Sequence, residues 1–259
     1  MLPQSNVLAG RRGLAGLLAG GLALAACGAN HDTDCLKNNG TVITERRAVD
    51  RRLNKVVVYT NVDLTIVPDT ATYAEVQAGE NVVQDIEFST PSGPRQLVIK
   101  NTSTCNWVRS YNTPRQVRLH VARPHRSFDI EQYGYGLINT EGQWAQDTLF
   151  LRLWSTGDFN MNVRSTYLYL DNYDAGDITL HGTAEDFHPN FGSNGFLFAS
   201  DLDARYCYFY TYREWVGDMH VRSHQNLGGT LAGTGRLFYT GNPSLVFVQG
   251  PNAGSIFKE

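Results

Sequence analysis

GDFNMNVRSTYLYLDNYDAGDI, residues 157–178, begins and ends with the same pattern of glycine, aspartate and an apolar residue. Similar glycines, each followed within two residues by an apolar side chain, recur at positions 136, 157, 176, 195, 217, 235 and 254. By subtraction, the steps between them are 21, 19, 19, 22, 18 and 19 residues. Seven marks at nearly equal spacing indicate a repeat architecture in which each repeat holds two or three short strands.

The composition also favours strands. The chain contains 25 Gly and 13 Tyr but only 3 Met, which is typical of many short strands joined by turns. We therefore predict an all-β solenoid of about six coils in the C-terminal half. Each coil would bury its inward side chains against its neighbours, and each glycine would occupy a tight corner with positive φ. The alternative is a glycine-rich sandwich whose turns are evenly spaced.

The region before residue 133 predicts further strands, without a regular repeat. Short apolar or alternating runs are separated by turn residues, and Thr90–Pro94 reads as a hairpin loop. The predicted strands are Val56–Tyr59, Val62–Val67, Tyr73–Ala78, Asp85–Ser89, Gln96–Lys100 and Gln116–Ala122.

The N-terminus carries a predicted export signal. Arg11 and Arg12 precede an apolar run over residues 13–26, which is too short to span a bilayer comfortably but fits the core of a signal peptide. The run ends in Leu-Ala-Ala followed by Cys27, which resembles the lipobox of bacterial lipoproteins. This resemblance implies that residues 1–26 are a lipoprotein signal peptide and that Cys27 is lipidated. The alternative is an ordinary secretory signal with a chance cysteine.

A lipidated Cys27 would tether the mature chain to a membrane. A lipoprotein cysteine carries more than one acyl chain, enough for a stable anchor, and the polar residues 27–39 would form the tether. We expect a cell-envelope protein delivered to the outer membrane, with the leaflet undecided. An exported chain can also form disulfides. Because Cys207 lies in a strand-like run and suits the core, we predict that Cys35 pairs with Cys105.

Charge and motifs argue against several classes of function. The net charge of −3, with no basic block, argues against nucleic acid. The sequence has neither a Gly-x-Ser-x-Gly elbow nor a phosphate-binding loop, so we predict no catalytic residue and no cofactor. Asp158 and Asp177 could share a calcium ion if the coils align, but their place after a corner glycine favours a turn role, so no metal site is predicted. His220 and His224 lack a third ligand and are interpreted as exposed side chains.

Aromatic residues are the best candidates for ligand binding. In residues 166–170 (TYLYL) and 206–212 (YCYFYTY), one alternate set suits the interior, which turns the other set outward. Counted from the corner glycines, aromatic residues fall at similar positions in three successive coils. We therefore predict an outward ladder, suited to stacking on sugars or docking a partner, that consists of Tyr167, Tyr169, Phe187, Tyr206 and Tyr208. The alternative is that these rings only cover a loop or a neighbouring coil.

Further short motifs accompany the glycine repeats in a fixed order. They are Asp34-Cys35, residues 40–46 (GTVITER), residues 62–66 (VDLTI), Glu80-Asn81, residues 99–101 (IKN) leading into 105–111 (CNWVRSY), and residues 239–243 (YTGNP). Together they resemble the head GIN domain, an auto-transporter adhesin domain of exported proteins in Bacteroidetes-type bacteria, over roughly residues 35–259.

The resemblance implies a right-handed parallel β-helix with a strand-rich N-terminal part, without catalytic residues and with a role in cell adhesion. The predicted domain spans residues 40–259, with N-terminal strands and a hairpin in 40–132 and solenoid coils in 133–259. Residues 186–200 depart from the pattern, because His188-Pro189-Asn190-Phe191 replaces a cleaner glycine repeat. The coil count is open there.

Three functions follow from these expectations, in order of preference. The first is a non-catalytic binding or adhesion module of an envelope lipoprotein, whose partners are the membrane at Cys27 and a glycan or cell-surface protein. The second is a self-assembling structural protein of the envelope, because open solenoid ends expose strand edges. The third is a carbohydrate-active β-helix enzyme, a lyase or hydrolase, which would need acidic or basic groups converging in a groove.

Overall fold

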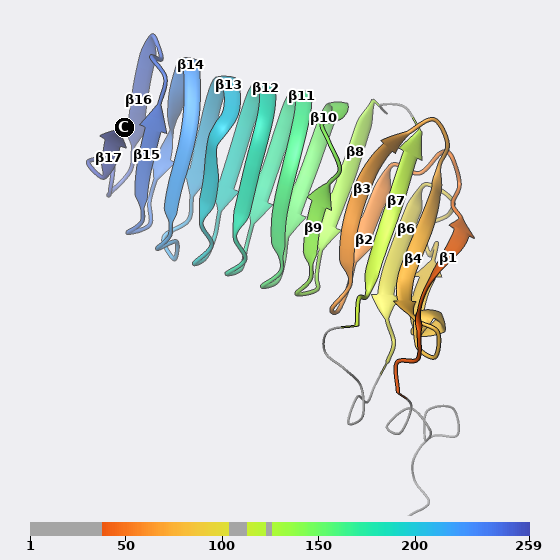
Figure 1. Cartoon of the computed structure of the whole chain (residues 1–259). Helices are drawn as coiled ribbons and strands as arrows, with labels where there is room; N and C mark the ends of the chain where they lie inside the picture. The colour runs from red at the N-terminus through yellow and green to blue at the C-terminus, as the bar shows by residue number, and fades with distance from the viewer. Residues whose placement is uncertain (1–37, 104–112, 123–125) are drawn as a thin grey trace, which may run out of the picture.

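The protein is built almost entirely of β-strands. The computed structural model describes residues 38–103, 113–122 and 126–259, and these ranges contain strands and one 3₁₀ turn but no α-helix (Figure 1). In chain order the elements are β1 (Val42–Ala48), β2 (Lys55–Val58), β3 (Asp63–Asp69), β4 (Tyr73–Gly79), η2 (Val83–Asp85), β5 (Ile86–Ser89), β6 (Gln96–Asn101), β7 (Gln116–Ala122), β8 (Ser127–Gln132), β9 (Leu137–Thr140), β10 (Trp144–Leu153), β11 (Asp158–Asn172), β12 (Ile178–Phe191), β13 (Leu197–Thr211), β14 (Asp218–Leu231), β15 (Arg236–Thr240), β16 (Leu245–Gln249) and β17 (Ile256–Lys258). They stack into a β-solenoid of about 7 turns, which confirms the predicted fold class.

Each turn of the solenoid, called a rung here, contributes to two walls. The long strands β11 to β14 serve both walls because each bends near its middle. In β14, Asp218–Arg222 pairs in parallel with β15, whereas Asn226–Thr230 pairs in parallel with β16. We call the wall that contains β3, β7, β9, β15 and β17 the first wall. The wall that contains β2, β6, β8, β10 and β16 is the second wall (Figure 1).

The sequence of β11 shows how one strand turns this corner. Its buried apolar residues occur at alternate positions within each half: Phe159, Met161, Val163, Leu168 and Leu170. The alternation changes parity at Thr166 and Tyr167, two consecutive exposed residues. A strand that bends around the core places two successive side chains outside, so this pair marks the bend between the walls.

The corner glycines stack in a column, but for a different reason from the predicted one. None of the following has a positive φ: Gly136, Gly157, Gly176, Gly195, Gly217 and Gly235. Instead, a Cβ on Gly176 would lie 1.9 Å from the carbonyl oxygen of Gly157. Successive turns approach so closely that only glycine fits. Gly254 lies outside the column, because nothing lies within 4 Å of its Cβ position.

Buried polar side chains hold this corner from inside. Gln132 Nε2 donates to the carbonyl oxygen of Gly136, and Asn172 Nδ2 donates to that of Gly176, each at 2.8 Å. These side chains satisfy carbonyl groups that close stacking removes from water.

The N-terminal strands join the stack out of chain order. In the second wall β2 lies between β6 and β8, and in the first wall β3 lies between β7 and β9, always in parallel register. The rung of β2 and β3 is therefore enclosed by rungs that follow it in the sequence. The strand-rich N-terminal part is thus continuous with the solenoid.

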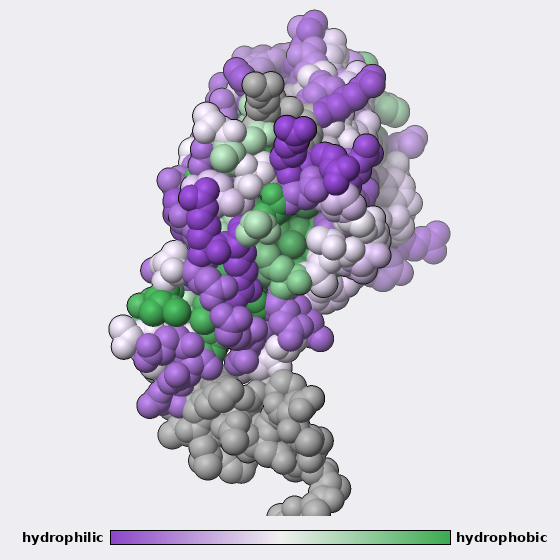
Figure 2. Space-filling model, turned by 90° about the vertical axis from the view of Figure 1, so that its right-hand side faces the viewer, coloured by the Kyte–Doolittle hydropathy of each residue, from purple (hydrophilic) through white to green (hydrophobic). Residues whose placement is uncertain are grey.

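Antiparallel strands close this end of the core. β4 pairs with β7 and β1 pairs with β4, while β5 pairs with β6. Arg47 of β1 donates hydrogen bonds to the carbonyl oxygens of Val83, at 2.9 Å, and Ile86. Figure 2 looks onto this end and shows polar side chains around a narrower apolar strip. The stack therefore has a cap here, as solenoids require for solubility.

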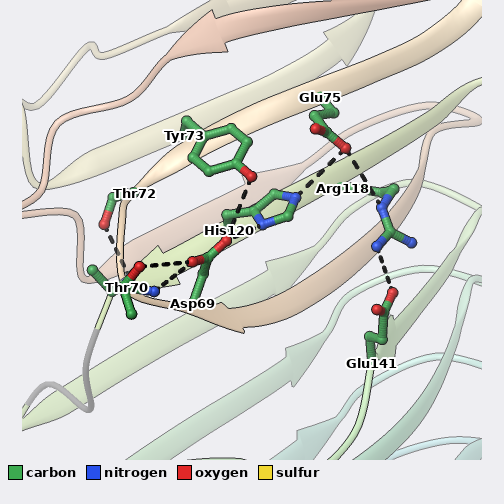
Figure 3. Close-up of polar contacts among 9 residues, drawn as sticks. Asp69, Thr70, Thr72, Tyr73, Glu75, Arg118, His120 and Glu141 are labelled. Carbon is green, nitrogen blue, oxygen red and sulfur yellow. Dashed lines mark hydrogen bonds and ion pairs between the residues drawn. The ribbon is translucent and has the colours of Figure 1, made fainter.

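A polar cluster joins the cap to the first wall (Figure 3). His120 on β7 is buried, with Nδ1 2.7 Å from Asp69 Oδ2 and Nε2 3.6 Å from Glu75 Oε2. Its ring stacks on Tyr73 of β4, with the ring centroids 4.1 Å apart. Hydrogen bonds from the backbone N–H of Thr70 and from His120 lower the pKa of Asp69 to about 2. The carboxylate therefore stays ionised further into the acid range than an ordinary aspartate does.

The C-terminal end has no comparable cap among the described residues. β16 pairs with β14 in the second wall, and its outer edge is free within the described chain. Val246 continues the inward row of Leu227, yet it is 42% exposed, and Leu245 and Phe247 are 54% and 53% exposed. Apolar side chains of the last rung are therefore exposed to solvent at this end of the core.

Candidate binding site on the second wall and the bend

Four of the five residues in the predicted aromatic ladder lie on the outer face of the second wall. Parallel register and ring contacts arrange them in two rows across β11, β12 and β13: Tyr167, Asp186 and Tyr206 in one, and Tyr169, His188 and Tyr208 in the other. Tyr167 and Tyr208 are the most exposed of the four. The structure therefore gathers these tyrosines on one surface.

The prediction that Phe187 points outward is wrong. Its side chain is 1% exposed and lies in the core, in register with Leu168 and Cys207. Phe187 stands 11 residues after Gly176, as the inward Leu168 stands 11 after Gly157. A shift of one residue moves a side chain to the opposite face of a strand, so similar spacing was not enough. His188 takes the outward position instead.

The outward rings stack on one another along the solenoid axis. The ring centroids of Phe150 and Tyr169 lie 5.1 Å apart, and those of Tyr169 and His188 lie 4.9 Å apart, with interplanar angles of 13° and 17°. Burial lowers the pKa of His188, which favours the neutral ring in this stack. Both faces of Tyr169 are therefore covered. The ladder offers ring edges to a ligand and leaves little room for a sugar to stack face-on within it.

Two more aromatic ladders run along the solenoid, and sequence reasoning missed both. At the corner, the rings of Tyr59, Tyr133, Trp154 and Tyr173 are stacked at centroid distances of 5.1, 6.0 and 4.5 Å. On the first wall a second set is stacked at 6.0, 4.7 and 5.3 Å, and consists of Phe198, His220, Phe238 and Phe257. His220 is thus half-buried in a ladder, not an exposed side chain. Stacking of like rings across rungs stabilises the solenoid.

A groove follows the bend between the two walls. It has a volume of about 1040 Å³ and crosses the rungs of β8, β10, β11, β12, β13 and β14. The buried small residues Ser165 and Ala184 form its floor. Thr166 and Thr183 are exposed on its sides. Small side chains at each bend therefore produce a continuous channel parallel to the stack.

Ion pairs neutralise one part of this groove. Glu185 Oε1 lies 2.7 Å from Arg205 Nη1 on the next rung. Asp203 Oδ1 lies 3.5 Å from Arg222 Nε and also contacts His224 Nε2. The carboxylates of Glu185 and Asp203 are thus engaged in exposed ion pairs between rungs, which contribute little to stability individually.

The other part of the groove carries charged side chains that have no partner among the described residues. Arg126 and Asp147 lie on one side, on the rungs of β8 and β10, and Arg164 lies on the rung of β11. All three are exposed, and none forms an ion pair or side-chain hydrogen bond with another described residue.

The predicted turn role of the corner aspartates is confirmed at two positions. Asp158 Oδ1 accepts a hydrogen bond from the backbone N–H of Asp177 at 2.8 Å, and Asp177 Oδ1 accepts one from Phe196 at 3.2 Å. Each carboxylate thus binds the backbone of the next rung. No group of three or more acidic, histidine or cysteine side chains suited to a metal occurs in the part of the chain that the structure describes.

The predicted cysteine roles are only partly visible. Cys207 is buried and free, as predicted for a core residue, and burial raises the pKa of its thiol. The lipidation site Cys27 and the predicted pair Cys35 and Cys105 lie outside the described residues. Among the residues that are described, no helix has the length and apolar character needed to cross a membrane.

Solenoid proteins present long surfaces for binding. Comparison with known proteins shows which family of such proteins the chain belongs to. Residues 52–243 match the family model described as "Putative auto-transporter adhesin, head GIN domain". The match covers well over half of the chain, so the protein belongs to this family. No curated protein matches the chain.

Solved structures share the same fold. A "putative adhesin" from Bacteroides fragilis has a TM-score of 0.71 at 16% identity, covering 86% of this chain and 99% of its own. A "putative lipid binding protein" from Parabacteroides distasonis has a TM-score of 0.65 at 18% identity, covering 86% and 100%. A "putative adhesin" from Parabacteroides merdae has a TM-score of 0.60 at 14% identity, covering 86% and 98%. At these identities the likeness supports the fold alone.

Proposed function

We propose that this protein is a lipid-anchored adhesion protein of the cell envelope that binds an extended glycan in the groove at the bend. The observation that carries the proposal is the groove itself, a polar channel that crosses successive rungs. It contains exposed hydroxyls and charged groups that have no partner in the described part of the chain. Membership of an adhesin family supports the adhesion role. The leader over residues 1–26, followed by Cys27, supports export and lipidation, and Gly28 in place of a retention aspartate permits delivery to the outer membrane.

The chemistry of the groove favours a glycan over an acyl chain. Arg126 and Arg164 can donate hydrogen bonds and Asp147 can accept them, so the groove suits a ligand with many hydroxyl groups. An acyl chain would instead need an apolar channel. Although one structural neighbour is named as lipid binding, the polar groove here favours sugar.

Filling the groove should abolish binding without unfolding the protein. Thr183 is exposed in the middle of the groove, so Thr183→Trp should project a large ring into the channel. We expect the variant to lose at least tenfold in affinity for every glycan that the full chain binds on an array. Its thermal unfolding midpoint should stay within about 2 °C of the unmodified protein, as expected for a surface substitution.

The matched control is Thr90→Trp, because Thr90 is exposed in the loop between β5 and β6, outside the groove. This variant should bind glycans as the unmodified protein does. Equal glycan binding by Thr183→Trp and Thr90→Trp would contradict the proposal, as would a full chain that binds no glycan on the array.

A second candidate function, self-association in the envelope, rests on the uncapped C-terminal end. Antiparallel pairing of β16 with β16 of a second copy, centred on Phe247, would place Val246 opposite Val248 and join the two inward rows. Such a two-fold contact is self-complementary. Because antiparallel strands cap the other end, association would stop at two copies.

Disrupting the C-terminal edge should therefore give a monomer. We expect the full chain to sediment as a dimer at micromolar concentration. Phe247→Asp should sediment as a monomer, because the two-fold contact would place two like charges directly opposite each other. Tyr135→Asp is the control, since Tyr135 is 64% exposed at a different place. A full chain that stays monomeric at all concentrations would exclude this second function, and filaments would contradict the two-fold contact.

A further inference from the structure

Three charged side chains of the groove, which have no partner within the described ranges, narrow the class of glycan that the groove can hold, provided that it is the binding site proposed above. Arg126 lies on the rung of β8, next to the rung of β10 that carries Asp147, because Ser127 is in register with Thr148. Arg164 lies one rung further, on β11, because it is in register with Ala145. The charges therefore follow the groove in the order positive, negative, positive.

These three groups differ from the other charges in the groove. Glu185 pairs with Arg205, and Asp203 contacts both Arg222 and His224. Arg126, Asp147 and Arg164 line the same channel and are exposed, yet none pairs with another described residue. A ligand that enters the channel therefore meets, in this part, charged groups that have no partner among the described residues.

The chemistry of each charged side chain determines which functional group of the ligand can bind beside it. A guanidinium group matches a carboxylate in shape and charge, and binds it through two parallel hydrogen bonds. Asp147 can only accept hydrogen bonds while it is ionised, so it repels an acidic group and accepts from a hydroxyl or amide. Neighbouring rungs lie about 4.8 Å apart, so the backbone positions of the two arginines are separated by about 10 Å along the axis. This separation is close to the length of a disaccharide.

We propose that the groove recognises a linear acidic glycan in which carboxylate-bearing sugars alternate with neutral sugars. The carboxylates bind Arg126 and Arg164, and the neutral sugar between them donates a hydroxyl or amide hydrogen to Asp147. A glycan with an acid on every sugar places a negative charge against Asp147. A neutral glycan leaves both arginines without their preferred partner.

Calorimetric titration of the full chain with three octasaccharides tests this proposal. The probes are a hyaluronan fragment, in which glucuronate alternates with N-acetylglucosamine, an oligogalacturonate with an acid on every sugar, and a neutral cello-oligosaccharide. We expect the hyaluronan fragment to bind at least tenfold more tightly than the other two. Its affinity should fall as salt is raised, because the contacts with the arginines are exposed.

Variants of the groove charges give opposite expected shifts. Arg164→Gln should weaken binding of the alternating fragment about tenfold, which corresponds to 1.4 kcal/mol, and should reduce its salt dependence. Asp147→Asn should strengthen binding of the oligogalacturonate by removing the repulsion. Arg213→Gln, at an exposed arginine outside the groove, should change neither affinity.

The outcomes separate this inference from the proposed function. Suppose that the neutral probe binds as tightly as the alternating one, that Arg164→Gln has no effect, and that Thr183→Trp abolishes binding. The inference of an alternating acidic glycan is then wrong, but the proposal that the groove binds a glycan is supported. If none of the three probes binds, the inference is also overturned, and the array experiment with Thr183→Trp decides the proposed function separately.

Discussion

Replacing Gly176 by alanine should lower the free energy of unfolding by about 3 kcal/mol or more, because it forces apart two successive rungs of the solenoid. The added Cβ would lie 1.9 Å from the carbonyl oxygen of Gly157 and 2.6 Å from a methyl carbon of Leu153. The first contact is with backbone, which cannot rotate away as a side chain can. In thermal unfolding, the midpoint should fall by roughly 6–12 °C for a chain of this size.

The control for this prediction is Gly254→Ala. Gly254 ends the series of spaced glycines, but nothing lies within 4 Å of its Cβ position and its φ is not positive. Its replacement should change the free energy of unfolding by less than about 0.5 kcal/mol. Equal effects of the two substitutions would show that the glycines do not stack as described here.

Replacing Trp215 by alanine should destabilise the protein by about 3–5 kcal/mol. Trp215 is fully buried, although it lies in the connection between β13 and β14, and its ring packs edge-on against Phe191. Its Nε1 also donates to the carbonyl oxygen of Gly195 at 3.1 Å. Alanine would therefore leave both a cavity and an unsatisfied carbonyl group, and urea unfolding should report the loss.

Trp215→Phe separates these two contributions. Phenylalanine keeps most of the buried ring volume but cannot donate to Gly195, so we expect a loss of about 1–3 kcal/mol, the cost of an unsatisfied buried acceptor. A loss as large as that of Trp215→Ala would show that the hydrogen bond, and not the filled volume, is the larger contribution.

The spacing of the glycines predicted the solenoid well, because close stacking of the rungs requires a glycine at the same corner of each rung. It gave the wrong reason, positive φ, because two different constraints select the same residue: a left-handed backbone and a lack of space for a Cβ. The longest step, from Gly195 to Gly217, lies in the segment where Trp215 inserts into the core. The position of β2 and β3 between later rungs could not be predicted in this way, since a strand's sequence does not specify which strand pairs with it.

The candidate site was harder to predict than the fold. Outward positions of Tyr169 and Tyr208 followed from alternation, but the error at Phe187 shows that counting from glycines does not determine parity. β12 and β13 are joined with a register irregularity between Thr179 and His181, and such irregularities change which residues share a face. The groove was missed because its lining residues are far apart in sequence. Arg126 and Arg164, for example, are 38 residues apart and line the same groove only because the rungs stack in register.

Hydrogen–deuterium exchange of the full chain, with and without a bound glycan, would locate the ligand most directly. The bend groove should gain protection on binding, so exchange should slow in residues 145–147, 164–166 and 183–185. The corner segments near Gly157 and Gly176, on the other side of each rung, should exchange at unchanged rates. Protection confined to the corner or to the exposed end at β16, with no change along the bend, would contradict the account.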